Sequence, residues 1–98
     1  TVFTGCNVEN ASYGLTMCAE RTALFAAVSA GHRTITHVVV ASESHPPAAP
    51  CGACRQVIRE FGPDALVFAV NPSGDQWQTT LDTLLPRSFG PEDLSAPL

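Results

Sequence analysis

The sequence predicts an α/β fold in which helices pack on the face of a sheet. Two apolar runs, "ITHVVVAS" and "ALVFAV", have the length of buried strands, and each follows a segment of helical composition. Together with a β-branched segment at the start of the chain, they give the order strand, helix, strand, helix, strand. This alternation is typical of layered α/β domains.

Residues 1–9, "TVFTGCNVE", are rich in β-branched residues and indicate a first strand, with a loop at "NASYG". A helix is expected over 18–31, where Gly31 is a suitable C-cap and helical spacing is approximated by Ala19, Leu24, Ala27 and Val28. The run at 35–42 then predicts a strand that is buried on both faces.

A proline-rich loop, "ESHPPAAP", leads into a second predicted helix over 51–62, with Gly62 as its stop and an inward face of Val57, Ile58 and Phe61. Residues 65–70 predict a third buried strand, which ends in a turn at "NPSGD". The segment "QWQTTLDTLLP" predicts a short strand or turn and a helical piece, and "RSFGPEDLSAPL" an irregular tail. With no repeat or linker visible, residues 1–98 are expected to form a single domain.

Composition excludes several classes of function. The chain has 98 residues, 45% apolar and 14% charged, which suits a small core that a metal or partner subunits would help to stabilise. A net charge of -4 with scattered arginines argues against nucleic acid as a partner. No apolar run approaches the roughly 20 residues that a membrane span needs. The start of the chain lacks the regions of a signal peptide, so we expect the cytoplasm, where thiols stay reduced.

The cysteines indicate a zinc site. Cys51 and Cys54 fall at i and i+3 in the first turn of the second predicted helix, and Cys18 opens the first predicted helix. Helix N-termini favour thiolates, the form that binds zinc. Three protein ligands with one open position are typical of a catalytic zinc rather than a structural one.

Three other readings of the cysteines are weaker. A redox pair would follow a strand directly, in a different context from "PCGACRQV". A closed structural zinc site would need Cys6, which lies on the strand side and away from a helix end. Unrelated buried thiols would not explain the placement of three cysteines at two helix ends.

Glu20 adds a candidate catalytic group. It lies two residues after Cys18, where a carboxylate can project near the metal without binding it and can carry a proton between a water and a substrate. A favourable charge at a helix N-terminus is the simpler explanation of Glu20 alone. Beside three cysteines at two helix ends, the catalytic interpretation is preferred.

These motifs resemble a known family. "CNVENASYGLTMCAERTA", "PCGACRQV" and "LLPRSFGPEDL" are similar to cytidine deaminases of the small, homotetrameric, three-cysteine type. The resemblance runs over nearly the whole chain and implies a three-layer α/β/α fold with a mixed sheet. The family normally begins with a further helix and strand, so the sequence is expected to be short at its N-terminus.

The resemblance also implies roles for individual residues. Cys18, Cys51 and Cys54 would bind one zinc ion, and Glu20 would shuttle protons in the hydrolytic deamination of cytidine or deoxycytidine. The backbone at Ala19 and Cys51 would contact the base. Asn7 and Glu9 would hold a ribose hydroxyl. Phe89 would stack on the base in a neighbouring subunit's pocket, and Tyr13 would lie near a subunit boundary.

Physical arguments support the ribose contacts and add a role for Arg21. Asn7 and Glu9, at i and i+2 of an extended segment, point the same way and offer a donor and an acceptor to a hydroxyl. Arg21 can donate to a cysteine sulfur and draw charge from an electron-rich, three-thiolate zinc, and this interpretation is preferred over that of an ordinary surface arginine. Two alternatives stay open: a deaminase of a modified cytosine nucleoside such as blasticidin S, and a zinc-stapled module without activity.

Overall fold

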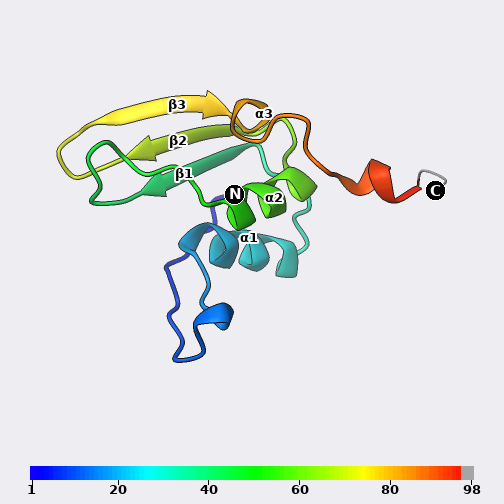
Figure 1. The fold of residues 1–98 in the computed structure, drawn as a ribbon, viewed down its shortest axis with the longest axis horizontal. Coiled ribbons are helices and arrows are strands. Elements are labelled where there is room, and N and C mark those ends of the chain that lie inside the picture. The colour runs from blue at the N-terminus through cyan, green and yellow to red at the C-terminus, as the bar shows by residue number, and fades with distance from the viewer. Residues whose placement is uncertain (96–98) are drawn as a thin grey trace.

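The computed structural model describes residues 1–95 and contains a mixed three-stranded sheet in the order β1-β2-β3. Strand β1 (His37–Ala41) pairs in parallel with β2 (Leu66–Val70), and β2 pairs antiparallel with β3 (Gln76–Thr80). Helices α1 (Ala19–Ser29) and α2 (Gly52–Phe61) lie together on one side of this sheet (Figure 1). The predicted α/β class with a mixed sheet is therefore confirmed.

Both long helices begin and end close to the predicted positions. Helix α1 has Ala30 as its C-cap, one residue before the predicted Gly31, and Gly31 adopts a φ of 94°, a left-handed conformation that suits glycine after a helix end. Helix α2 ends at Phe61 with Gly62 as its C-cap, as predicted. Of its expected inward face, Ile58 is fully buried, whereas Val57 and Phe61 are half-buried against the core.

The core joins the helices to the sheet and to the short helix α3 (Leu81–Leu84). Its centre consists of Leu24 from α1, Ile58 from α2, Ala65 and Leu81, with Ile35 and Val38 packed around it. Burying a side chain the size of leucine or isoleucine contributes about 1.5–3 kcal/mol to the free energy of folding. The packing of α1 beside α2 is therefore fixed by the best-buried part of the molecule.

The strand predicted over residues 1–9 does not form. Among the described residues this segment makes one isolated β-bridge, in which Val8 and Met17 exchange two backbone hydrogen bonds of 2.8 and 2.9 Å. It packs on α1 instead of on the sheet. A Cβ atom at Gly5 would lie 2.5 Å from the backbone N of Ala23, so only glycine permits this close approach. β-branched composition predicted an extended segment, but not which surface it lies against.

The strand predicted over 35–42 forms at β1, but it is not buried on both faces. Val40 is 6% exposed, whereas Val39 on the opposite face is 63% exposed. Strand β1 is at the edge of the described sheet, and the helices cover only one of its faces (Figure 1). Strand β2 is better buried, since Val67 and Ala69 are inaccessible and the alternate residues are half-buried.

The remaining elements are short. The loop expected at "NASYG" contains the 3₁₀ helix η1 (Tyr13–Leu15), and the tail expected to be irregular contains a second, η2 (Pro91–Ser95). The short strand and helical piece predicted after the "NPSGD" turn form as β3 and α3. No helix within residues 1–95 is long and apolar enough to cross a membrane.

Candidate metal centre

Two of the candidate zinc ligands lie at the start of α2. Cys51 is the N-cap residue, with an extended backbone, and Cys54 lies in the first turn of the helix. Their sulfur atoms are 3.4 Å apart. The Cys51 side chain makes no capping hydrogen bond, so its sulfur points to the other thiols rather than back to the helix.

The third candidate ligand comes from α1. Cys18 is the N-cap of that helix and also makes no capping bond, and its sulfur lies 3.6 Å from that of Cys51. All three sulfurs lie within 4.8 Å of one another, and none forms a disulfide. The predicted pairing of two helix N-termini around three thiols is present in the structure.

The sulfur cluster fits a zinc ion. Zinc–thiolate bonds of about 2.3 Å in a tetrahedron place the sulfurs about 3.8 Å apart. The measured separations of 3.4 and 3.6 Å are close to this edge. Cys18, Cys51 and Cys54 occupy three corners and leave the fourth position to a non-protein ligand, as in catalytic zinc sites.

Helix α2 acts differently on its two thiols. The backbone N–H groups of Cys54 and Ala53 help to lower the pKa of Cys51, because they stabilise a thiolate at the helix N-terminus. Burial raises the pKa of Cys54 strongly, and the neighbouring Cys51 and Glu20 side chains raise it further. A metal cation compensates for the unfavourable charge on Cys54, since zinc binds the deprotonated sulfur.

Glu20 and Arg21 flank the cluster on the first turn of α1. The Glu20 carboxylate is half-buried and close enough to Cys54 to affect its pKa. The Arg21 guanidinium donates from Nη2 to the Cys18 sulfur at 3.6 Å, and its contacts with Cys18 and Cys54 raise the pKa of Arg21. The Nε atom of Arg21 is buried without a partner among the described residues. These positions are compatible with the roles predicted for both residues.

The expected nucleoside contacts lie partly beside this cluster. The side-chain oxygen of Asn7 accepts a 2.7 Å hydrogen bond from the backbone N–H of Ala19, so Asn7 caps the helix that carries Cys18. Glu9 is the residue after Val8, which pairs with Met17 in the β-bridge, and it is exposed. The bridge thus brings Asn7 and Glu9 next to the start of α1.

The structure does not bring two other predicted residues to the metal centre. Tyr13 lies in η1, at the tip of a loop that extends from the body of the molecule, and is 86% exposed (Figure 1). Phe89 is 57% exposed in the tail, where its backbone carbonyl accepts a 2.9 Å hydrogen bond from Gln56 on α2. Cys6 is exposed and does not belong to the three-sulfur cluster.

Sequence reasoning missed two residues that support the cluster. Arg55 donates from Nε to the carbonyl of Pro50 at 2.7 Å and from Nη1 to that of Leu84 at 2.9 Å. A cation near a helix N-terminus is unfavourable because of the helix dipole. An arginine in the first turn of the second predicted helix could therefore have indicated that Arg55 has a specific partner. The second is Asn71. Its position between a buried strand and a turn could have indicated a side chain that bonds to the backbone of the turn.

Comparison with known proteins gives one consistent family. Residues 1–70 match the model of the cytidine and deoxycytidylate deaminase zinc-binding region. The cytidine deaminase of Sporosarcina psychrophila is 49% identical over 96 residues, which are 97% of this chain and 71% of the relative. That of Halalkalibacterium halodurans is also 49% identical, over 97% of this chain and 73% of the relative. The crystal structure of cytidine deaminase from Burkholderia pseudomallei superposes with a TM-score of 0.87 and 54% identity, covering 91% of this chain and 72% of that one.

Proposed function

Because this chain belongs to the cytidine and deoxycytidylate deaminase family, we propose that it deaminates cytidine and deoxycytidine by hydrolysis. Water replaces the amino group of the base, which gives uridine or deoxyuridine and ammonia. The observation that carries the proposal is the cluster of three thiols at two helix N-termini with a carboxylate beside it. This arrangement has the components of a hydrolytic zinc site.

Zinc is the cofactor that the donor set fits. Cys18, Cys51 and Cys54 would hold it, and when bound it lowers the pKa of a water and so supplies a nucleophile at neutral pH. Arg21 donates to the Cys18 sulfur and thereby withdraws negative charge from an all-thiolate site. The buried Cys54 gains most from the cation, because its thiolate is otherwise disfavoured.

We propose Glu20 as the proton carrier. Its carboxylate lies beside Cys54, at the edge of the cluster, and is not one of the three sulfur ligands. From there it can accept a proton from the attacking water and give it to the ring nitrogen. It can then accept the proton of the hydroxyl group that has added to the ring carbon and give it to the amino group, which leaves as ammonia while the carbonyl of the product forms. A group that exchanges protons in this way must keep contact with both solvent and substrate, and Glu20 is half-buried.

Asn7, Glu9 and Ala19 are proposed nucleoside contacts. The Asn7 carbonyl oxygen is engaged by the Ala19 N–H, so the amide NH₂ of Asn7 is the group available to donate to a ribose hydroxyl. The exposed Glu9 carboxylate can accept the hydrogen of the same hydroxyl. A base contact at the backbone N–H of Ala19 would require it to exchange its bond with Asn7 or share it.

We also propose a homotetramer that completes each substrate pocket across subunit boundaries. The support is apolar exposure: Phe89, Tyr13 and Leu94 are 57%, 86% and 77% exposed. Exposed aromatic and leucine side chains of this kind favour association. In the tetramer Phe89 would stack on the base in a neighbour's pocket, and Tyr13 would lie at a subunit boundary. Free thiols and a thiolate metal site support a cytoplasmic setting.

The proposed reaction is tested with a panel of substrates. Zinc-loaded protein is mixed with cytidine, deoxycytidine and blasticidin S, and the loss of the amino group is followed by ultraviolet absorbance and by ammonia release. We expect turnover of the first two and none of the third. Preference for blasticidin S would favour a modified nucleoside as the substrate, and zinc binding without turnover of any of them would favour a zinc-stapled module.

A further inference from the structure

The loop of residues 42–50 connects β1 to α2 and delivers Cys51 to the metal centre. It contains three prolines and ends at Pro50, which is fully buried directly before Cys51. Its first residue, Ser42, donates its backbone N–H to the carbonyl of Val70 at 3.1 Å, and the Ser42 hydroxyl accepts from the N–H of Ala48 at 3.2 Å. The loop therefore depends on contacts with the neighbouring hairpin for its position.

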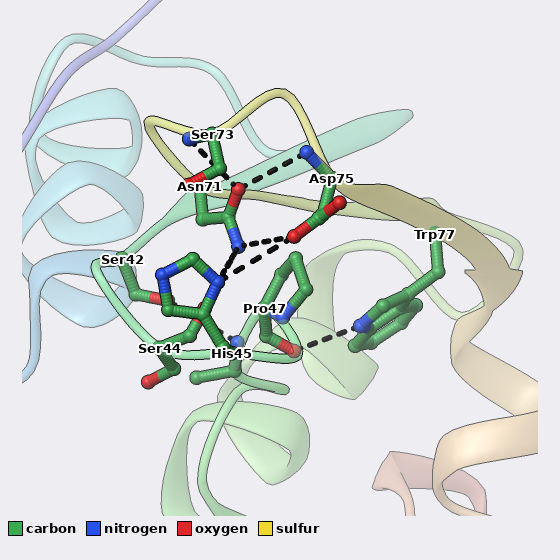
Figure 2. A network of polar contacts seen from close by, with 9 residues as sticks. Ser42, Ser44, His45, Pro47, Asn71, Ser73, Asp75 and Trp77 are labelled. Carbon is green, nitrogen blue, oxygen red and sulfur yellow. Dashed lines mark hydrogen bonds and ion pairs between the residues drawn. The ribbon is translucent and has the colours of Figure 1, made fainter.

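Asn71 provides the central contact with that hairpin. It is 8% exposed and lies where β2 turns toward β3. Its Nδ2 donates to the Ser44 carbonyl at 3.0 Å and to the Asp75 carboxylate at 3.1 Å, and it lies 3.1 Å from Nδ1 of His45. Figure 2 shows this amide between the loop that carries Ser44 and His45 and the turn that carries Ser73 and Asp75.

The carbonyl oxygen of Asn71 serves the other side of the junction. It accepts from the backbone N–H groups of Ser73 and Asp75 at 3.1 and 3.0 Å, which closes the turn. One side chain thus accepts from the turn and donates to the loop. An aspartate at this position would keep the two acceptor bonds and lose both donors, and it would add a negative charge beside Asp75.

A second contact fixes the same loop nearer to the metal. The indole Nε1 of Trp77, on β3, donates to the carbonyl of Pro47 at 2.8 Å (Figure 2). Beyond it, Arg55 donates to the carbonyl of Pro50. The loop is therefore held at Ser44, Pro47 and Pro50 by donors from outside it, and Cys51 comes next.

The three thiols differ in what positions them. Cys54 is completely buried within α2, so helix packing fixes its sulfur. Cys18 and Cys51 are both N-cap residues with extended backbones, so the position of each depends on its helix and on the segment that precedes it. For Cys51, which is exposed, that segment is the loop of residues 42–50, and the path of the loop therefore helps to determine where the Cys51 sulfur lies.

We infer that Asn71 is a positioning residue for the metal centre: it holds the loop of residues 42–50 against the β2–β3 turn and thereby places Cys51 to bind zinc with Cys18 and Cys54. The inference rests on the zinc site of the proposed function. Asn71 takes no part in the chemistry, and it acts at a distance from the thiols through Ser44 and the loop.

The test compares Asn71→Asp with the wild-type holoenzyme. Zinc affinity is measured by competition with a chromophoric chelator, and the cobalt-substituted protein is examined for its thiolate-to-metal charge-transfer bands. We expect zinc affinity to fall about tenfold, the lower end of the effect of residues that orient metal ligands, and the cobalt bands to shift. Gln78→Glu adds the same charge at an exposed position on β3 and should change neither measurement.

A double variant separates positioning from stability. In Asn71→Asp/Asp75→Asn the net charge is restored and an amide again faces a carboxylate across the turn, but the Ser44 carbonyl still lacks its donor. We expect the thermal midpoint to recover toward that of the wild type while the zinc affinity stays low. Recovery of both together would overturn the inference, because Asn71 would then act only through the stability of the hairpin.

The outcomes distinguish this inference from the proposed function. Wild-type zinc affinity and cobalt bands in Asn71→Asp, in a protein that binds zinc and deaminates cytidine, would overturn the positioning role alone. A wild-type protein that binds no zinc through its three thiols would overturn both.

Discussion

The metal centre and the N-terminal arm, residues 1–17, lie side by side and are built in opposite ways. Cys54 and Ile58 on α2 are completely buried, and Leu24 on α1 is 4% exposed, so packed helices bring together the two helix starts that carry the sulfurs. The arm instead extends from α1, with Val2 at 87% and Tyr13 at 86% exposure (Figure 1). The Val8–Met17 bridge closes the arm on itself, and the arm contacts the rest of the chain through the Asn7 cap, the packing of Gly5 on α1 and the ring contact of Phe3 with His32.

The difference is also one of energy. Several buried side chains, each contributing about 1.5–3 kcal/mol, hold α1 against α2. The fold of the arm itself depends on the bridge between Val8 and Met17, which consists of two hydrogen bonds, each with a net contribution of about 1 kcal/mol. We therefore expect the metal half of the site to be complete within one chain and the substrate half to need further surfaces to fix it. Five substitutions, ordered by expected effect, test this division.

Loss of a ligand should have the largest effect. Cys51→Ala removes a sulfur that lies 3.6 Å from Cys18 and 3.4 Å from Cys54, so we expect loss of bound zinc and of all measurable deamination. Metal content by atomic absorption and the ultraviolet assay provide the two measurements. Cys6→Ser is the matched control and should keep both zinc and activity. Loss of zinc in Cys6→Ser would instead indicate a closed four-cysteine site.

Glu20→Gln should come next. The substitution keeps the shape of the side chain and removes the proton acceptor, so zinc should stay bound while turnover falls a hundredfold or more, within the ~10²–10⁴ range of general acid–base catalysis. Turnover number and metal content are measured on the same preparation. Near-normal turnover with zinc bound would reduce Glu20 to a favourable charge at the N-terminus of α1.

Substitutions in the arm should have smaller effects, and comparing KM with the thermal midpoint should separate substrate binding from protein stability. Glu9→Ala removes one contact to the ribose hydroxyl, and we expect KM to rise about tenfold, with the thermal midpoint unchanged because Glu9 is exposed. Asn7→Ala should raise KM to a similar extent and also destabilise the protein by about 1 kcal/mol, since it removes the cap of α1. An unchanged KM in both variants would exclude the arm from the nucleoside site.

Phe89→Ala should have the smallest effect of the five. Stacking of a base on an aromatic ring contributes about 1 kcal/mol, so KM should rise about fivefold while zinc content stays the same. Gln56 donates a hydrogen bond to the Phe89 carbonyl. Gln56→Ala removes this bond but keeps the Phe89 ring, so it should raise KM less than Phe89→Ala does. If neither variant changes KM, Phe89 is an ordinary anchor of the tail.

Sequence predicted the metal half of the molecule better than the arm, for physical reasons. Cys18, Cys51 and Cys54 lie at helix starts that caps and glycine stops make visible in the sequence, and the packing of Leu24 near Ile58 then brings two of those starts together. Residues 1–9 carried only a composition signal. Their contact with α1 depends on Gly5 meeting the Ala23 backbone, a tertiary fact that no local pattern contains.

Burial was predicted less well for the strand of residues 35–42 than for that of 65–70. Both are continuous apolar runs, yet Val39 is 63% exposed and Val67 is inaccessible. The difference comes from their places in the sheet, since β2 lies between two strands and β1 at an edge. Asn71 escaped notice for a similar reason, because its importance depends on Ser44 and Asp75 meeting it from both sides.

We propose that each chain holds its own metal site but shares its substrate pocket with a neighbouring subunit. The most direct test is complementation between inactive Glu20→Gln chains and Phe89→Ala chains that bind substrate less well. Phe89→Ala chains are dissociated and reassembled with an excess of Glu20→Gln chains, and activity at low cytidine concentration is measured per chain with an intact Glu20. A shared pocket predicts a rise of about fivefold toward the wild-type value, because each intact Glu20 then faces a neighbour's intact Phe89. Wild-type chains mixed in the same way should show no change. No rise in the Phe89→Ala mixture, despite proven exchange of subunits, would contradict the shared pocket.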